Sequence, residues 1–387
     1  MIVVQSKNEN DSHYPINQNT HSGSKFTMKL LKPALLLLTL SALAACSQES
    51  NQTAQKEGQN TTSSASAPAE KPLVVNLYSA RKEALIKPLL EQFTSETGIK
   101  VNVISSKADA LLKRIENEGI NSPADVLLTT DAGRLHRAKQ AEIFTTLASE
   151  KFNDIPAQYR DPDMNWVGLS VRVRPIMVTQ AGMEFQLSRY EDLARKDLQG
   201  QICVRSSGNI YNQSLIAGML AHSESTEVES WAKGVVDNMA RNPQGGDRDQ
   251  VRAAAAGQCS VVVANTYYLA NMISDPNNEA DFAAGSALSV IWPNQDDRGA
   301  HVNVSGAGIL KTAPNKDNAL ALVEFLAGDS AQEIYANVNF EYPVKPGIAI
   351  HPILESWGEF KADDLELAKL GINNADAVKL FDRAGWK

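Results

Sequence analysis

Residues 73–104 read LVVNLYSARKEALIKPLLEQFTSETGIKVNVI, and this stretch sets the fold class. It opens with a short apolar run at 73–78 that predicts a β-strand. Residues 83–97 then carry apolar side chains at helical spacing, and Gly98 is typical of the residue that ends a helix. The apolar positions of this helix are Leu85, Ile86, Leu89, Leu90 and Phe93. A second strand is predicted at 99–104, which completes a strand–helix–strand unit.

The same alternation continues along the chain. A helix is predicted at 108–118, a short buried strand at 125–128 and another helix at 133–140. This order of strands and helices is typical of a mostly parallel sheet with helices on both faces. A long strand region follows at 166–178, after which strands and helices alternate afresh. The pattern therefore predicts an α/β protein with two lobes.

The order of the elements also suggests how the lobes divide the chain. We expect the first lobe to comprise residues 73–168 and about 292–342, and the second to comprise 169–291 and about 343–387. Ligands of open α/β sheets bind beyond the carboxyl ends of the strands. Two such lobes in an exported protein suggest a solute-binding protein with its ligand in the cleft between them.

Composition excludes several classes of protein. The chain has 387 residues, of which 43% are hydrophobic and 21% charged. This composition argues against a disordered, a collagen-like or a multi-span membrane protein. A net charge of −8 without a basic block argues against binding to nucleic acid. Three cysteines are too few for a disulfide-built scaffold or a four-cysteine zinc site.

The N-terminal part of the sequence predicts export. Met28 opens a segment with two lysines, which the short apolar run 33–43 follows. Residues 43–46 read Leu-Ala-Ala-Cys, which resembles a bacterial lipobox. The resemblance implies that residues 1–45 are a leader, with Met28 as an alternative start, and that Cys46 carries a lipid. The alternative is a plain secretory signal with an incidental cysteine.

A flexible tether is predicted at 46–72. This stretch is rich in Ser, Thr, Gln, Asn, Ala and Glu and has almost no large apolar side chain. A segment of this composition has too little apolar surface to form a packed core. One lipid and one tether describe a folded part that is held near a membrane and not within it.

The two remaining cysteines are Cys203 and Cys259, and each lies where a predicted strand begins. In an oxidising compartment such a pair is expected to form a disulfide between neighbouring strands. Two buried free thiols are the alternative.

Four tyrosines stand where predicted strands give way to loops or helices. Tyr78 ends the first strand, Tyr211 follows the strand of Cys203, and Tyr267 and Tyr268 follow the strand after Cys259. A cation of high charge favours the phenolate form of tyrosine, and a hard oxygen anion suits ferric iron. Any single one of them could instead be a packing residue with one hydrogen bond.

Six segments carry a resemblance to a known family. They are Tyr78-Ser79-Ala80-Arg81, 125–131 (DVLLTTD), Arg172-Val173-Arg174, 206–213 (SSGNIYNQ), 265–268 (NTYY) and 301–306 (HVNVSG). On these segments the sequence resembles the bacterial periplasmic ferric-iron-binding proteins of ABC transporters, including the iron-deficiency-induced cyanobacterial type. The resemblance extends from about residue 73 to the C-terminus, and the spaced tyrosines are its most specific mark.

The resemblance implies a two-lobe periplasmic-binding-protein fold of type II and a site for Fe(III) in the interlobe cleft. The implied iron ligands are Tyr78, Tyr211, Tyr267 and Tyr268. Water or a synergistic anion such as carbonate would complete the coordination. The residues expected to stabilise phenolate or anion charge are Arg172, Arg174 and Arg81. The choice between Arg172 and Arg174 stays open at this stage, and a surface salt bridge is the alternative for both.

The expected function is that of a lipid-anchored extracytoplasmic protein that delivers Fe(III) to an ABC importer with its permease in the inner membrane. We expect a monomer in the periplasm or cell envelope, anchored to the membrane by lipid only and without a nucleic-acid partner. The alternative is a solute-binding protein whose small ligand, a cationic ring or an oxyanion, stacks on the same tyrosines. No enzyme is expected, since the sequence has no Gly-x-Ser-x-Gly elbow, His-Glu-x-x-His helix or Walker loop.

Overall fold

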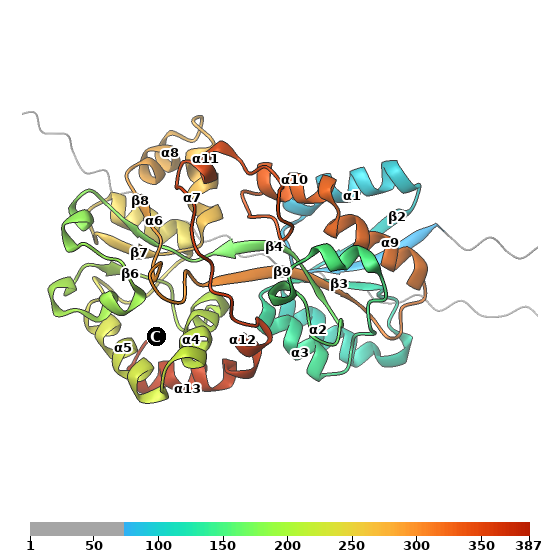
Figure 1. Ribbon diagram of the computed structural model, residues 1–387, viewed down its shortest axis with the longest axis horizontal. Coiled ribbons are helices and arrows are strands. Elements are labelled where there is room, and N and C mark those ends of the chain that lie inside the picture. Colours follow the sequence, from blue (N-terminus) through green and yellow to red (C-terminus); the bar gives the residue numbers. More distant parts are fainter. Residues whose placement is uncertain (1–72) are drawn as a thin grey trace, which may run out of the picture. The chain divides into compact units, whose positions relative to one another are not determined.

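The computed structural model describes residues 73–387, which form two β-sheets with helices packed around them (Figure 1). The predicted leader at 1–45, the lipidation site Cys46 and the tether at 46–72 lie outside the described residues. Within residues 73–387, none of the helices combines the length and the apolar character that a membrane crossing requires.

The first sheet has five strands in the order β2-β1-β3-β9-β4. In that order they span Lys100–Ser105, Val74–Ser79, Val126–Thr130, Val302–Ile309 and Val167–Val173. β1 runs parallel to both β2 and β3, as the alternating pattern predicts. β9 comes from much later in the chain, lies between β3 and β4, and runs antiparallel to both.

Helices pack on both faces of this sheet. They are α1 (Glu83–Thr97), α2 (Ala108–Glu118), α3 (Ala132–Gln140), α9 (Lys316–Ala327) and α10 (Asp329–Asn337). The predicted helix at 83–97 is confirmed as α1. It buries the side chains of Ile86, Leu89 and Phe93 and ends at Gly98, where φ is 71°. A residue without Cβ adopts this left-handed conformation without steric cost, which explains the glycine.

The second sheet has four strands in the order β6-β7-β5-β8. In that order they span Ile202–Cys203, Val261–Val263, Ile176–Val178 and Ser289–Ile291. β6 and β7 are parallel, whereas β5 is antiparallel to both β7 and β8. This second sheet is therefore mixed.

The remaining helices also come after β6 in the chain, and most of them pack around the second sheet or against one another (Figure 1). They are α4 (Ile210–His222), α5 (Ser225–Asp237), α6 (Asp247–Ala255), α7 (Thr266–Ile273), α8 (Glu279–Ser286), α11 (Pro352–Glu355), α12 (Ala368–Ile372) and α13 (Asn374–Ala384). We call this part the second lobe and the part around the first sheet the first lobe.

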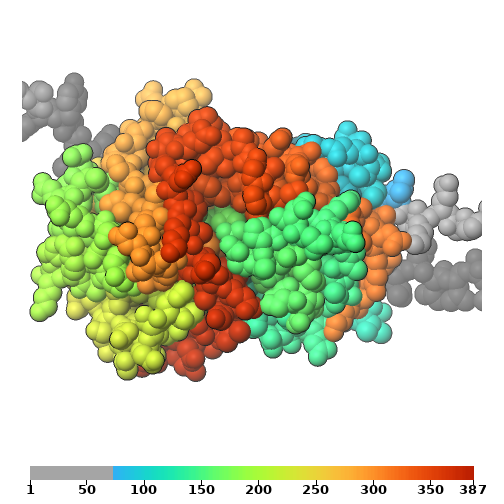
Figure 2. Space-filling view, viewed as in Figure 1, coloured from blue at the N-terminus to red at the C-terminus, as the bar shows by residue number. Residues whose placement is uncertain are grey.

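The chain passes between the two sheets at the end of β4 and again between β8 and β9. All of β4 belongs to the first sheet, so this sheet extends beyond residue 168, the limit expected from the sequence. The C-terminal segment, red in Figure 2, runs over the boundary between the lobes. Within it, α12 packs against α3 of the first lobe and α4 of the second.

A disulfide joins Cys203 to Cys259, with the two Cα atoms 5.9 Å apart. Cys203 ends β6 and Cys259 lies just before β7, which is its neighbour in the second sheet. The bridge therefore ties together the two strands that lead into Tyr211 and Tyr267.

Candidate functional site

A cavity of about 270 Å³ lies between the two lobes. Its wall from the first lobe consists of Ala80, Arg81, Lys82, Ala84, Leu85, Thr130, Arg172 and Glu341. Its wall from the second lobe consists of Tyr211, Arg248, Tyr267, Tyr268 and Asn271. Both walls contain residues at the carboxyl ends of strands, where the rule for α/β sheets places ligands.

Three of the four predicted tyrosines meet in this cavity. Tyr211 is the second residue of α4, and Tyr267 and Tyr268 are the second and third residues of α7. The hydroxyl of Tyr267 donates to that of Tyr211, with 3.4 Å between the two oxygens. The ring centres of Tyr267 and Tyr268 are 4.2 Å apart. Because all three residues lie in first helical turns, the helix dipoles favour negative charge on their phenols.

Tyr78, the fourth predicted tyrosine, lies outside the cavity. Its hydroxyl donates to the carboxylate of Glu118, 2.9 Å from Oε1, and the guanidinium of Arg114 lies 5.0 Å from its ring centre. Side chains alternate between the faces of a strand, and this one points from β1 toward α2. The prediction of Tyr78 as a ligand is therefore corrected, since Arg81 and Lys82 of the following turn face the cavity instead.

Arg172 is the arginine of β4 that reaches the cavity. Its guanidinium lies 5.5 Å from the ring centre of Tyr211, and Nη2 donates to the carbonyl of Val304 at 2.6 Å. Burial by itself would lower the pKa of Arg172, but the neighbouring Tyr211 and Glu341 raise it above its usual value. The guanidinium therefore stays charged beside the phenols.

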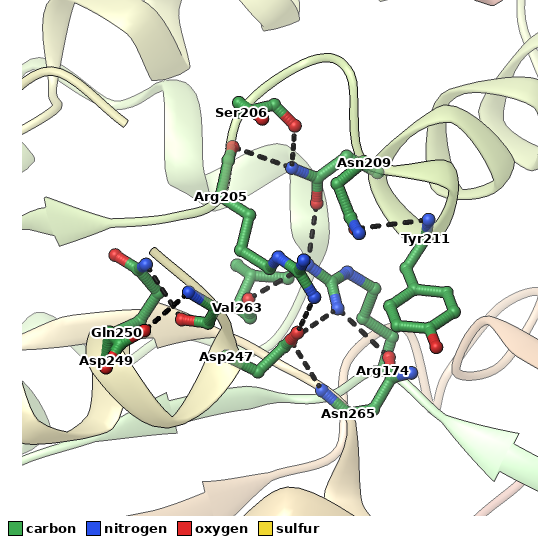
Figure 3. Close-up of polar contacts among 12 residues, drawn as sticks. Arg174, Arg205, Ser206, Asn209, Tyr211, Asp247, Asp249, Gln250, Val263 and Asn265 are labelled. Atoms are coloured by element: carbon green, nitrogen blue, oxygen red, sulfur yellow. Dashed lines mark hydrogen bonds and ion pairs between the residues drawn. The ribbon is translucent and has the colours of Figure 1, made fainter. Parts of the chain in front are cut away.

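Arg174 lies in a buried hydrogen-bond network beside the cavity. Its guanidinium donates to Asp247 at 3.0 Å and to Asn212 at 2.6 Å, and Asp247 also accepts from Arg205 at 2.6 Å (Figure 3). This buried network holds the first turn of α6 and the residue after Tyr211. Arg174 lies outside the cavity because β4 ends at Val173, so the strand alternation does not extend to it.

Arg81 lies in the cavity wall and is neutralised by Glu341. Nη1 donates to Oε2 of Glu341 at 2.8 Å and Nη2 donates to Oε1 at 3.0 Å, and both side chains are buried. Burial by itself would raise the pKa of Glu341, but Arg81 and Arg172 lower it overall. The result is an ion pair at the base of the turn after β1, with Ser170 as a further hydrogen-bond donor to Glu341.

The phenols of α7 hold their protons tightly in the absence of a cation. Burial raises the pKa of Tyr267, and the neighbouring Tyr211 and Tyr268 raise it further because adjacent phenolates repel each other. Arg172 opposes this rise. Burial also raises the pKa of Tyr268. A bound cation would have to displace these protons.

Several cavity residues were missed in the sequence. Lys82 could have been found, because it follows Arg81 at a strand end. Asn271 could have been found too, because it lies one helical turn after Tyr267. Arg248 and Glu341 carry no comparable signal, since folding brings them in from α6 and from the segment that follows α10. Residues 73–387 contain no group of three or more His, Cys, Asp or Glu side chains suited to a metal ion. The three tyrosines of the cavity are oxygen donors of another kind.

Comparison with known proteins identifies the family of this chain. The family model of bacterial extracellular solute-binding proteins matches residues 121–361. Iron uptake protein A1 of Synechocystis sp. is 44% identical over 315 residues, which cover 81% of this chain and 87% of that protein.

Two solved structures are also similar. The Trichodesmium protein (IdiA, FutA) in complex with iron and citrate has a TM-score of 0.78 and 46% identity, over 81% of this chain and 100% of its own. The ferric binding protein from Campylobacter jejuni has a TM-score of 0.76 and 36% identity, with the same two coverages. The comparisons confirm the predicted fold, the two-lobe α/β fold of type II periplasmic binding proteins.

Proposed function

This chain belongs to the family of bacterial extracellular solute-binding proteins, and on that premise we propose that it binds ferric iron outside the cytoplasm and delivers it to an ABC importer. The chain is a solute-binding protein and not an enzyme. One observation carries the assignment of the ligand: Tyr211, Tyr267 and Tyr268 bring three phenols from two helix starts into one interlobe cavity.

The chemistry of the cavity supports a ferric ion. Phenolate is a hard oxygen anion, which a small trivalent cation prefers to soft sulfur ligands. The cation in turn lowers the pKa of the phenols, and the first turns of α4 and α7 stabilise the negative charge that results. Ferrous iron would gain less from phenolate charge, so the site should favour the ferric state.

The charge of the cavity supports an anionic co-ligand. Arg81 is paired with Glu341, which leaves Lys82, Arg172 and Arg248 as cations around the tyrosines. Three phenolates balance the charge of a ferric ion, so these cations would remain uncompensated without an anion. We infer that a synergistic anion such as carbonate completes the coordination. The Trichodesmium structure, which is in complex with iron and citrate, is a precedent for iron and an anion in one complex.

A second candidate ligand is an oxyanion without iron. The three cations favour it, whereas they argue against the cationic ring that the sequence left open. Stacking on the tyrosines has little support, because Tyr267 and Tyr268 already pack against each other. The double variant Tyr267→Phe, Tyr268→Phe separates the two candidates, since it keeps the rings and removes the ligating oxygens.

Delivery to a membrane transporter is part of the proposal. The Leu-Ala-Ala-Cys sequence at 43–46 supports a lipid on Cys46, and the composition of 46–72 supports a tether. Such an anchor would keep a monomeric periplasmic protein close to the permease in the inner membrane. Closure of the two lobes around the ion would give the permease a surface that differs from that of the iron-free protein.

The test is a visible spectrum with a metal count on the purified protein. We expect about one iron for each chain and a visible tyrosinate-to-iron charge-transfer band, both of them lost in the Tyr267→Phe, Tyr268→Phe variant. An iron-loaded wild type without such a band would contradict the tyrosine site. A variant that still retains iron as wild type does would contradict it as well.

A further inference from the structure

Asp131 connects the first lobe to the helix of the second lobe that carries Tyr211. Its side chain is fully buried at the start of α3. Oδ1 accepts from the backbone N–H of Gly133 at 2.9 Å and so caps the helix. Oδ2 accepts from Ser214 of α4 at 2.7 Å and from Asn303 of β9 at 2.8 Å. One carboxylate thus joins three elements, one of which belongs to the other lobe.

The backbone of Asp131 has a conformation that favours glycine. Its φ is 86° and its ψ is 123°, although it carries a full side chain. Such a conformation costs on the order of 1–3 kcal/mol and persists where the surroundings demand it. A glycine would remove this cost but would also remove the carboxylate. The strained residue therefore points to a requirement for the carboxylate at this position.

The contacts of Asp131 lead back to the tyrosine cavity by two routes. Through Ser214 they reach α4, where Tyr211 lies one turn earlier. Through the backbone they reach Val304, whose carbonyl accepts from the N–H of Asp131 at 2.8 Å and from Arg172 at 2.6 Å. Arg172 in turn contacts Tyr211, since its guanidinium lies 5.5 Å from the ring centre of that tyrosine.

We propose that Asp131 and Ser214 are positioning residues, which hold Tyr211 of the second lobe at a set distance from Arg172 of the first. This inference rests on the proposed function, because the benefit of a fixed Tyr211 is a preorganised iron ligand. Neither residue lines the cavity, so neither would contact the ion. Their effect on iron would pass through α4.

Ser214→Ala tests the proposal, and Ser122→Ala is its matched control. Ser122 also donates to a carboxylate at 2.7 Å, that of Glu118, but this pair lies within the first lobe. The Ser214 bond is buried and the Ser122 bond is partly buried, so both alanine variants should lose some stability without iron, Ser122→Ala somewhat less. Only Ser214→Ala should release iron about tenfold faster to a chelator and shift the charge-transfer band. Ser214→Thr, which keeps the hydroxyl, should restore the wild-type rate.

Asp131→Gly provides a second test. It removes the helix cap and the acceptor of Ser214 and Asn303, and relief of the strained backbone offsets only part of that loss. The urea midpoint should therefore fall, and iron release should accelerate as in Ser214→Ala. Wild-type release rates in both variants would overturn the proposal, and so would equal acceleration in Ser122→Ala.

Failure of the proposed function can be recognised separately. A wild type that binds no iron refutes that function, and the positioning role is then decided in the iron-free protein. Ser214→Ala should speed amide hydrogen exchange in the first turn of α4, whereas Ser122→Ala should not. Equal exchange in wild type and both variants would overturn the positioning role itself.

Discussion

The hydroxyl oxygens of Tyr267 and Tyr211 lie 3.4 Å apart, although the two residues are on different helices and 56 positions apart in the sequence. Each is the second residue of a helix that follows a strand of the second sheet, and these strands, β6 and β7, are neighbours. Two parallel strands that end side by side thus bring two phenols together. This pair, with Tyr268, is the group on which the predictions about iron depend.

Tyr211→Phe should abolish or greatly weaken iron binding, because it removes one phenolate and leaves the ring in place. The expected loss is at least 100-fold in retention against a chelator, in line with the cost of removing a hydrogen-bonded, charged ligand. The matched control is Tyr78→Phe, which loses only the hydrogen bond to Glu118. Iron content and the visible band measure both variants. If Tyr78→Phe lost its iron and Tyr211→Phe kept it, the corrected site would be wrong.

Iron loading should release protons, and acid should reverse it. Burial and mutual repulsion raise the pKa of Tyr267, so its phenol is protonated at neutral pH and must lose the proton to bind. The apparent affinity should therefore fall as the pH falls, by about tenfold per pH unit for each ligating phenol. Titration with ferric chelate in weak buffer should show fewer released protons for Tyr267→Phe than for wild type. Equal release would mean that Tyr267 is not a ligand.

Glu341→Gln should destabilise the iron-free protein by about 3–5 kcal/mol, because it leaves the buried guanidinium of Arg81 without its counter-charge. The pKa of Glu341 lies below its usual value, so its contribution is present at neutral pH and is lost as the pH falls through that lowered pKa. The stability difference between variant and wild type, measured by urea unfolding, should therefore shrink in acid. Glu142→Gln, at an exposed ion pair with Lys311, should change the unfolding midpoint little. A difference that grew in acid would contradict the ion-pair interpretation.

Removal of the disulfide should lower stability by about 2–5 kcal/mol, because the bridge closes a long loop in the unfolded chain. The double variant Cys203→Ala, Cys259→Ala tests this in urea, and wild type treated with a reductant is its control. Since the bridge ties β6 to β7, iron retention should also fall in the double variant. It is measured without reductant, because a reductant would itself reduce Fe(III). Unchanged unfolding midpoints would show that the bridge contributes nothing to stability.

Local patterns in the sequence were sufficient to predict α1, the helix of the first strand–helix–strand unit. The apolar period of 83–97 and the glycine after it predict α1 with the observed bounds, because they describe contacts within a single helix. The same kind of information identified Tyr211, Tyr267 and Tyr268, since the end of a strand is a local feature and strand ends share one edge of a sheet.

Such local patterns could not predict which distant segments of the chain pair with each other. Nothing near residue 302 indicates that β9 enters between β3 and β4, and nothing near residue 341 indicates that Glu341 neutralises Arg81. Both depend on where the chain returns after a long stretch of sequence, which is 260 positions for Arg81 and Glu341. The packing of the whole fold decides this, and no local period encodes it.

The amino-acid sequence alone predicted the α/β class, the two lobes and the position of three tyrosines just after strands, because periodicity and strand ends are features of consecutive residues. The tertiary structure places Tyr78 outside the cavity, against Glu118. It brings Arg172 to the cavity and pairs Arg174 with Asp247 instead. The face of a strand that meets a helix, and the residue at which that strand ends, are set by pairing with other strands. It also placed Asp131 against Ser214, a contact that exists only where two lobes meet.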